Sequence, residues 1–363
     1  MKDRETAPLV ERVIRELTRR IPESRHTVCT VFFGGGTPTL LPADELAGLL
    51  RTVGKLVDVA ALDEFTVEAN PATVADEKAA LLVAHGVTRV SMGAQSFFPE
   101  ELAALERLHT PEDIAPSVAT LRRNGIREIN LDLIFGIPGQ TLDTWGESLR
   151  RVLALGPDHV ACYGLTFEPG TRLTAQRATG RVRPCDEELE AEMYLLALDT
   201  LTAAGYRQYE TSNYARPGWE SRHNLMYWRN RPYVAVGPSA VGCIGDRRYR
   251  NVPDIAAYVR LMDEQGHAEH EVEAVTPEML MLELPMMQLR LVEGLNLEQF
   301  RELTGADGRA LFADEIQRFT AGGLLTVDDA RMALTRKGRL LSDAVLRELA
   351  GACGRRDVTL PVL

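Results

Sequence analysis

Strand-like and helix-like segments alternate along the first 165 residues, and this alternation restricts the fold more than any other feature of the sequence. Five apolar runs each predict a buried strand, at 27–33, 64–69, 88–94, 128–135 and 159–165. Strands that alternate with helices at this spacing form βα units around a parallel sheet. Because crossovers between parallel strands are right-handed, the units build either a doubly wound sheet or a partial (β/α) barrel.

Helices are predicted at 9–21, 43–56, 73–84 and 142–155, with a longer helical stretch, broken near 110–111, that runs to about residue 123. After residue 166 the alternation stops. A helix at 186–204 leads into a stretch rich in Pro, Gly and aromatic residues that ends at 251. Residues 277–350 read as helical segments around the turn Gly322-Gly323, typical of a small winged-helix-like module.

We therefore expect an α/β chain in three parts: a partial barrel at 1–170, a post-barrel extension at 171–270, and a C-terminal helical (winged-helix-like) module at 271–363. The 363 residues carry a net charge of −11, which argues against nucleic-acid binding because phosphates repel an acidic protein. The first twenty residues have no apolar core of a signal peptide, and the most apolar later stretch, 233–245, is too short to cross a bilayer. A cytoplasmic protein is the expectation.

The five cysteines lie at positions 29, 162, 185, 243 and 353, and no two of them have a metal-ligand spacing. An odd, scattered set fits reduced thiols better than a disulfide framework. Cys29 and Cys162 fall in apolar strand-like runs, so we predict that both pack in the core.

Polar residues follow or end four consecutive predicted strands, where parallel α/β folds bind their ligands. The first strand ends in the turn Gly34-Gly35-Gly36-Thr37-Pro38, whose glycines allow close approach of a ligand to the backbone. By the two-residue period of a strand, the polar members of the next three share a face: Thr66 with Glu68, Ser91 with Gly93 and Gln95, and Asn130 with Asp132. A bare tight turn would explain the glycine run by itself. Hydrogen-bonded core polar groups would explain the polar residues of one strand, but not those of three strands in succession.

Arg107 lies on the helix that follows the third strand, where a solvated surface charge is the alternative interpretation. Together, two carboxylates, an amide, an arginine and an open glycine backbone suit a ligand with a cationic centre, a carboxylate and sugar hydroxyls. S-adenosylmethionine has all of these groups.

Successive sequence blocks carry a family resemblance: FFGGGTPTLL, TVEANP, RVSMGAQSF, LERLHT and NLDLIFGIPGQT, followed by YETSNYARPG and HNLMYW. In this order they resemble the radical S-adenosylmethionine superfamily, and within it the HemN/HemW branch. The resemblance implies a partial barrel and S-adenosylmethionine contacts at Gly35, Gly36, Thr37, Glu68, Gln95, Arg107 and Asp132.

The resemblance also implies a 4Fe–4S cluster on a CxxxCxxC loop that follows the first strand of the family's barrel. This sequence contains neither the motif nor that strand. We therefore expect no metal site in this chain, and a cluster only if an upstream segment exists. A start placed too late, or a fragment, is favoured over a natural protein without a cluster.

The block His223-Asn224-Leu225-Met226-Tyr227-Trp228 favours the heme-chaperone side of the branch. It implies heme as a ligand, with His223 as an axial ligand and Tyr227 and Trp228 beside the macrocycle, and heme proteins as partners. The Gly237-Pro238-Ser239-Ala240 stretch departs from the Gly-Ala-His of many relatives. Alternatives are an oxygen-independent coproporphyrinogen III oxidase and, from another class, a cluster-less scaffold or regulatory protein. A membrane-associated acceptor and a homodimer stay open.

Overall fold

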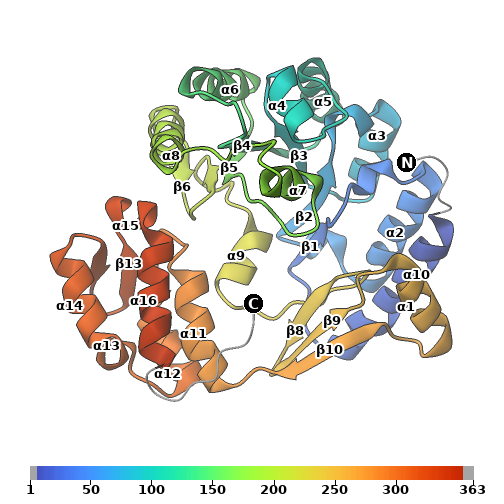
Figure 1. Ribbon diagram of the computed structural model, residues 1–363. Coiled ribbons are helices and arrows are strands. Elements are labelled where there is room, and N and C mark those ends of the chain that lie inside the picture. Colours follow the sequence, from blue (N-terminus) through green and yellow to red (C-terminus); the bar gives the residue numbers. More distant parts are fainter. Residues whose placement is uncertain (1–5, 355–363) are drawn as a thin grey trace. The chain divides into compact units, whose positions relative to one another are not determined.

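A seven-stranded, mostly parallel sheet is the largest sheet of the structure, a computed structural model that describes residues 6–354 (Figure 1). Its strand order is β1-β2-β3-β4-β5-β7-β6, and β1 to β5 pair in parallel. The strands are β1 (Thr30–Phe33), β2 (Glu64–Ala69), β3 (Arg89–Gln95), β4 (Glu128–Phe135), β5 (His159–Gly164), β6 (Arg207–Gln208) and β7 (Asn213–Ala215).

Helices connect these strands and cover the outside of the curved sheet, as Figure 1 shows for α2, α3, α5, α6 and α8. The connecting helices are α2 (Ala43–Leu56), α3 (Asp76–Ala84), α4 (Pro99–Ala104), α5 (Pro111–Arg123), α6 (Leu142–Leu155), α7 (Arg172–Ala178) and α8 (Glu187–Ala203), with short 3-10 turns η1 (Pro38–Leu40), η2 (Val59–Ala61) and η3 (Pro71–Thr73). Their apolar stripes pack on strands whose core-facing residues, such as Val67, Met92 and Leu133, are wholly buried.

The expected α/β fold is confirmed, and four of its predicted elements (α2, β2, β4 and α6) have the predicted bounds. The predicted break near 110–111 is also confirmed, because α5 starts at Pro111. The core position predicted for Cys29 is wrong. Cys29 is exposed, since it precedes β1 and only its backbone carbonyl joins the sheet, by accepting from the Asp63 N–H. Cys162 is buried as predicted.

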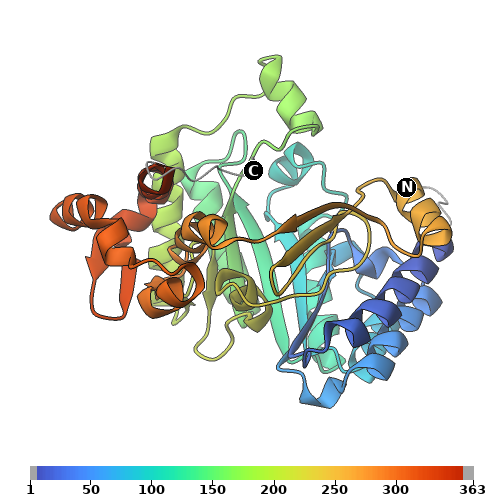
Figure 2. The ribbon, with the colours of Figure 1, turned by 90° about the horizontal axis from the view of Figure 1, so that it is seen from below.

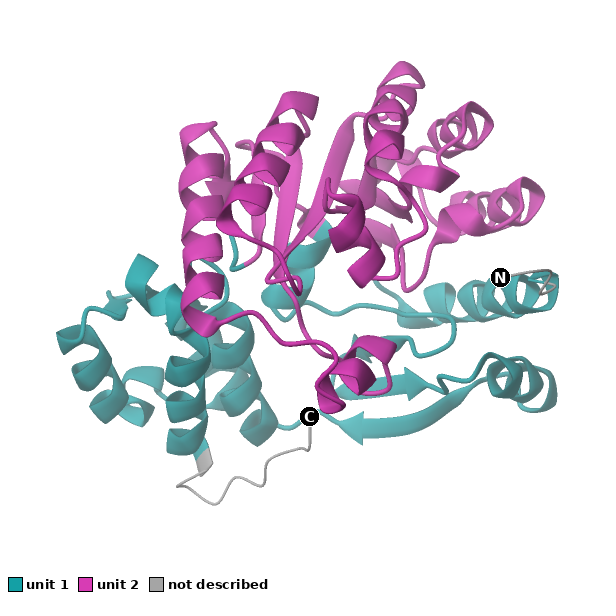
Figure 3. Cartoon of the chain, turned by 45° about the horizontal axis from the view of Figure 1, so that its top comes forward, with its two compact units in different colours: residues 1–27, 209–211, 223–363 teal, residues 28–208, 212–222 magenta. Residues whose placement is uncertain are grey.

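The chain divides into two compact units, shown in Figure 3: unit 1 comprises residues 1–27, 209–211 and 223–363, and unit 2 comprises residues 28–208 and 212–222. Unit 2 contains the seven-stranded sheet. Glu64, at the start of β2, joins this strand to the last segment of the unit: its carboxylate accepts hydrogen bonds from the Ser221 hydroxyl (3.2 Å) and the Arg222 backbone N–H (2.6 Å). The three-part division predicted from the sequence stays a prediction.

Unit 1 begins with helix α1 (Ala7–Ser24), which packs against α10 (Ile255–Glu264). The same unit holds α9 (Arg222–Trp228) from His223 onward and an antiparallel sheet of β8 (Val241–Ile244), β9 (Arg247–Asn251) and β10 (Glu269–Ala274). The wholly buried Glu16 carboxylate of α1 accepts hydrogen bonds from Arg20 (2.7 Å), the Gly237 N–H (2.9 Å), Asn251 (3.0 Å) and the Tyr258 hydroxyl (2.7 Å). One carboxylate therefore joins α1 to this part of the unit.

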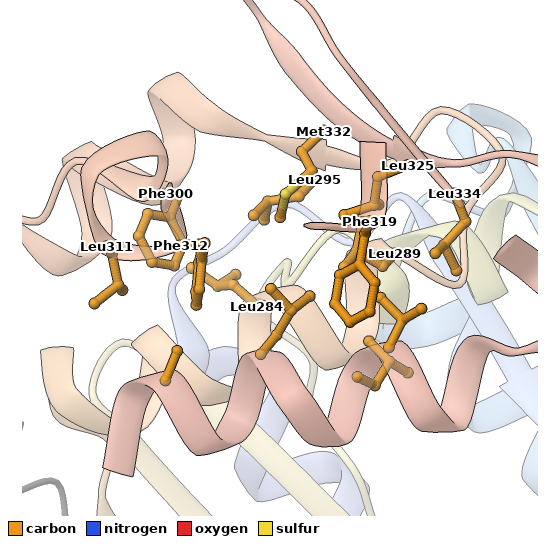
Figure 4. Close-up of a cluster of buried hydrophobic side chains, with 14 of the residues drawn as sticks. Leu284, Leu289, Leu295, Phe300, Leu311, Phe312, Phe319, Leu325, Met332 and Leu334 are labelled. Atoms are coloured by element: carbon orange, nitrogen blue, oxygen red, sulfur yellow. The ribbon is translucent and has the colours of Figure 1, made fainter. Parts of the chain in front are cut away.

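The C-terminal module of unit 1 combines helices with a small antiparallel sheet, β11-β13-β12. Its elements are α11 (Pro277–Gln288), β11 (Leu295–Asn296), α12 (Leu297–Thr304), α13 (Gly308–Leu311), α14 (Ala313–Ala321), β12 (Leu325–Val327), β13 (Arg331–Leu334), α15 (Arg336–Leu340) and α16 (Ser342–Gly354). Figure 4 shows its core, in which Phe300 and Phe312 lie among buried leucines. The centroids of their rings are 5.9 Å apart and the ring planes are tilted by 55°. The helical module expected here is confirmed. No helix within residues 6–354 is long and apolar enough to span a bilayer.

Candidate functional site

Strand register brings the polar residues of β2, β3 and β4 side by side in unit 2. Glu68 lies opposite Ser91, Ser91 opposite Asn130, and Gly93 opposite Asp132. Since all three strands are parallel, their C-terminal ends meet at one edge of the sheet. The side chains that share a face within each strand therefore also form one row across the strands.

Asp132 is held by a buried hydrogen-bond network. The Asn130 amide donates to one Asp132 oxygen at 2.6 Å and to the Ser91 hydroxyl at 2.7 Å, and Ser91 lies 3.4 Å from the other Asp132 oxygen. The Asn130 oxygen can only accept, so the Nδ1–H of His159 donates to it, at 2.6 Å. Burial raises the pKa of Asp132, whereas the bonds from Asn130 and Ser91 oppose that shift. The network therefore fixes the position of a carboxylate that has little access to water.

Glu68 is a second, half-buried carboxylate at this edge. Burial, and then the charge of Asp132, raise its pKa to about 7, although the Gly35 backbone N–H donates to it. A side chain at Gly34 would collide with Glu68, because a Cβ there would lie 2.8 Å from its carboxylate. The glycine turn thus lets the backbone approach Glu68 closely. Gly34 was not among the predicted contacts, and a bare run of three glycines does not distinguish its members.

The other predicted contacts surround these carboxylates less closely. Gln95 ends β3 in the left-handed region, with φ of 63°, and its side chain is buried. Arg107 is exposed, and its charge opposes the rise in the pKa of Asp132. Gly36 is exposed, and Thr37 precedes the η1 turn. A glutamine with left-handed backbone angles is unusual. At Gln95 this conformation bends the backbone sharply and leaves the side-chain amide at the end of β3.

The chemistry of this edge fits the polar groups of S-adenosylmethionine. Two neighbouring, half-buried carboxylates with raised pKa values gain most from a ligand that brings positive charge or hydroxyl donors. Glu68, Asp132 and Gln95 would hold such groups, with Gly35 and Gly36 offering open backbone. When bound together with a reduced cluster, the cofactor supplies radical chemistry in this family.

The described residues do not fit an iron–sulfur cluster. Within residues 6–354, no group of three or more His, Cys, Asp or Glu side chains is placed to hold a metal ion. Cys162 is buried, and burial and the nearby Asp132 both raise the pKa of its thiol. Since cluster ligands are thiolates, this cysteine is poorly suited to the role.

His223 lies on α9 in unit 1, beside two tyrosines. Its Nε2 lies 3.0 Å from the Tyr227 hydroxyl, and the two rings meet edge to face at 5.0 Å. Tyr227 in turn meets Tyr233 edge to face at 4.7 Å. Burial raises the pKa of Tyr227 to about 12, so its hydroxyl stays protonated. The structure thus brings His223 and Tyr227 together, whereas the Trp228 ring faces the Arg290 guanidinium at 6.0 Å.

Sequence reasoning missed two residues that these sites contain. His159 starts β5 and anchors Asn130, and Tyr233 completes the aromatic row beside His223. A histidine at the beginning of a strand gives no signal of its own. Tyr233 follows α9 by five residues, in a stretch without a recognisable period.

Comparisons with known proteins show the family to which the chain is similar. Residues 2–152 match the radical SAM superfamily, and residues 275–341 match the HemN C-terminal domain. The heme chaperone HemW of Bacillus subtilis (strain 168) is 36% identical over 323 residues, which cover 89% of this chain and 85% of the relative. HemW of Mycobacterium tuberculosis (strain H37Rv) is 38% identical over 325 residues, covering 90% and 81%. HemW of Escherichia coli (strain K12) is 32% identical over 341 residues, covering 93% and 88%.

Among solved structures, the radical SAM enzyme coproporphyrinogen III oxidase (HemN) from Escherichia coli superposes with a TM-score of 0.80. It is 24% identical in sequence and covers 96% of this chain and 83% of its own, a likeness that shows the shared fold. The sequence resemblance to this family is thereby confirmed. The chain belongs to the radical SAM superfamily, in the branch that contains the HemN and HemW proteins.

Proposed function

We propose that this chain binds heme and transfers it to heme proteins, as the name of its HemW relatives describes for them. The observation that carries this proposal is the identity of 36% and 38% to two heme chaperones over about nine-tenths of the chain. The solved structure of coproporphyrinogen III oxidase (HemN) is 24% identical to this chain, and this level of identity supports a common fold only. A heme-chaperone function is therefore favoured over the oxidative decarboxylation of coproporphyrinogen III.

The proposed heme site is centred on His223. A histidine nitrogen is a common axial ligand of heme iron, and two half-buried tyrosine rings supply an apolar wall for the macrocycle. Because Nε2 of His223 lies 3.0 Å from the Tyr227 hydroxyl, the iron would replace that hydrogen bond when it binds there. Trp228 lies on the same helix and would line the site from further along.

The second part of the proposal is an S-adenosylmethionine site at the strand ends of unit 2. Glu68 and Asp132 would accept from its amino group and ribose hydroxyls, Gln95 would bind its polar edge, and Arg107 would pair with its carboxylate. Gly35, Gly36 and Thr37 would contact it through the backbone. No step of heme transfer is assigned to this site.

Hemin titration tests the heme proposal. We expect the wild-type chain to saturate at one heme with a defined Soret band, and His223→Ala to bind roughly tenfold more weakly or not at all. His267→Ala and His270→Ala are matched controls on the same unit and should leave the band unchanged. A thermal melt of each variant establishes that it is folded.

Two results would overturn the axial assignment. Either the folded His223→Ala variant binds hemin as the wild type does, or the wild type shows no saturable band. In the first case heme binding stands and another residue ligates the iron. In the second case the heme function itself is lost, and assay of the chain for coproporphyrinogen oxidation becomes the next measurement.

A further inference from the structure

Helix α7 of unit 2 stands on the surface without a buried side chain. Figure 2 shows it at the top of the view, in yellow-green, joined to the rest of unit 2 by extended segments. Thr171 caps its start, Arg177 lies over the Phe167 ring at 4.8 Å, and Arg172 contacts Glu106 outside the helix. A seven-residue helix gains most of its stability from packing, and in α7 Leu173, Thr174 and Gln176 are no more than partly buried. One face of this helix is therefore available to a partner.

The segment around α7 is strongly basic in an acidic protein. Residues 169–185 contain four arginines, at 172, 177, 181 and 183, and no Asp or Glu, although the whole chain has a net charge of −11. All four side chains are exposed. Arg172 lies 3.0 Å from Glu106, but both side chains are more than half exposed, so water screens this pair and leaves Arg172 able to bind elsewhere.

A large apolar side chain lies beside these arginines. Helix α4 is followed, after its cap residue, by the left-handed residue Glu106, with φ of 55°, and the Arg107 N–H donates to the Leu102 carbonyl at 2.9 Å. This helix-ending turn directs the next residue, Leu108, into solvent, where 94% of it is exposed. Exposed leucines are common, but a nearly complete exposure next to a basic cluster is a feature of binding surfaces.

Both elements line one depression of about 540 Å³. Ala103, Ala104 and Leu173 supply small or apolar walls, whereas Arg107, Arg172 and Gln176 supply donors. One carboxylate, that of Glu106, also lines the depression, where its charge is offset by Arg172. Arginine next to an apolar hollow is the combination that dominates the energy of many protein interfaces. The volume lies within the range of about 300–1,000 Å³ that suits a compact ligand group.

We propose that this surface, formed by α7, Leu108 and the depression between them, binds an acidic segment of a partner protein. A large apolar side chain of the partner would fill the depression, and flanking carboxylates would pair with Arg172 and Arg181. The surface lies on segments that follow β3 and β5, at the same end of the sheet as Glu68 and Asp132. The inference goes beyond heme binding, and it stands whether or not the chain binds heme.

The shape and charge favour a protein segment over other polyanions. A nucleic-acid backbone would meet the arginines but carries no apolar side group to enter a depression walled by Ala103 and Leu173. An anionic lipid surface would meet the arginines and the exposed Leu108 but, because it is flat, would leave the depression unfilled. The remaining charge of the chain is negative, so an extended polyanion would be repelled beyond this surface. A short acidic segment avoids that repulsion.

A labelled synthetic peptide tests the proposal: fifteen residues rich in Glu and Asp, with a single central Leu, titrated into the whole chain without heme. We expect saturable binding that weakens about tenfold in the double variant Arg172→Ala/Arg181→Ala. A peptide with Ser in place of the central Leu, or the variant Leu108→Ser, should also weaken binding severalfold. Raising the salt from about 50 to about 200 mM should weaken it further, since surface charges are screened.

The matched control is Arg51→Ala/Arg127→Ala, which removes the same charge from two exposed arginines of unit 2, ahead of β2 and β4. It should leave peptide binding within about twofold of the wild type. Equal losses in both double variants would show a general charge effect and overturn the proposal. The absence of peptide binding would also overturn the proposal. Binding of phosphatidylglycerol vesicles would then assign the surface to lipid, and self-association that depends on the arginines, measured by sedimentation, would assign it to a second copy of the chain.

Discussion

The Asn130 side chain donates a hydrogen bond of 2.6 Å to the Asp132 carboxylate, two residues further along the same strand. Because the Asn130 oxygen accepts from the His159 N–H, the amide cannot rotate without losing both contacts. Asn130 is also buried. The geometry of Asp132, at the proposed cofactor site, therefore depends on an uncharged neighbour that could donate to it.

Replacement of Asn130 by Asp should destabilise the protein and do so more at high pH. The variant buries a third carboxylate against Asp132, and at pH 8 the free energy of unfolding should fall by at least about 2 kcal/mol. Acidic conditions allow one carboxyl to hold a proton, so the loss should be smaller at pH 5.5. Asn124→Asp is the matched control, because Asn124 donates to Asp76 in the same way but in solvent. Urea denaturation at both pH values measures the difference, and equal losses in the two variants would contradict the prediction.

Glu68 should make the stability of unit 2 depend on pH. Its pKa is about 7 in the folded protein and 4.5 ordinarily, so its contribution is fully present below about pH 4.5 and is lost as the pH rises through 7. Glu68→Gln should therefore be more stable than the wild type at pH 8, by on the order of 2 kcal/mol, and about equal at pH 5. Thermal or urea unfolding across this range measures the slope.

Glu147→Gln serves as the control for that experiment. The Arg151 guanidinium lowers the pKa of Glu147, so removal of this charge should not stabilise the protein at pH 8. A Glu68→Gln variant whose stability follows the wild type at every pH would refute the assignment of Glu68 as a half-buried, partly protonated carboxyl.

Tyr227→Phe should tighten hemin binding if His223 ligates the iron. The variant keeps both aromatic contacts of the ring but removes the hydroxyl that occupies Nε2 of His223. Loss of one hydrogen bond that competes with ligation predicts an increase in affinity of roughly threefold to tenfold. Tyr194→Phe, which removes a hydroxyl bonded to Gln208, is the control. Weaker hemin binding by Tyr227→Phe would mean that the hydroxyl orients the ligand instead.

Glu16→Ala should strongly destabilise unit 1. It leaves the buried Arg20 without its partner on α1 and removes acceptors from Asn251 and Tyr258. Removal of one partner of a buried ion pair costs about 3–5 kcal/mol, whereas Tyr258→Phe, which loses a single hydrogen bond, should cost about 1–2 kcal/mol. Equilibrium unfolding measures both variants, and comparable losses would show that the ion pair contributes little.

Treatment of this 363-residue chain with ferrous iron and sulfide should yield no stoichiometric cluster. Cluster ligands are thiolates, and the cysteines of this sequence have none of the spacings that place three of them around one cluster. Protein-bound iron and sulfide, measured after gel filtration, check the result. A stable cluster on this chain would contradict it.

Periodicity predicted the barrel elements well because their burial is local information. Strands β2 and β4 are buried on both faces, so their polar members Glu68 and Asp132 were conspicuous in the sequence. The same reasoning could not find the short strands β8 to β10. Strand β8 is a run of four residues, VGCI, too short to show a period, whereas β9 and β10 are rich in charged residues. Strand β10 is stabilised by cross-strand pairs such as Arg248 with Glu273 rather than by an apolar stripe.

The candidate site, too, has features that the sequence predicts and features that it does not. Which residues face the ligand edge follows from the two-residue period of each strand, but what they contact depends on register between strands. The bond between Asn130 and His159 joins two strands whose relative register no single segment specifies. Likewise, Cys29 could be placed only by the exact start of β1, and element ends are the least certain part of a sequence-based prediction.

The contacts of Glu16 also set an order of events during synthesis. Its partners Gly237, Asn251 and Tyr258 follow it by 221, 235 and 242 residues. At translation rates of about 5–20 residues per second, α1 waits roughly 10 to 50 seconds on the ribosome before its carboxylate can be buried. Over that interval α1 is an amphipathic segment that lacks these three hydrogen-bond partners. Unit 1 is therefore completed only after the sheet of unit 2 has been translated.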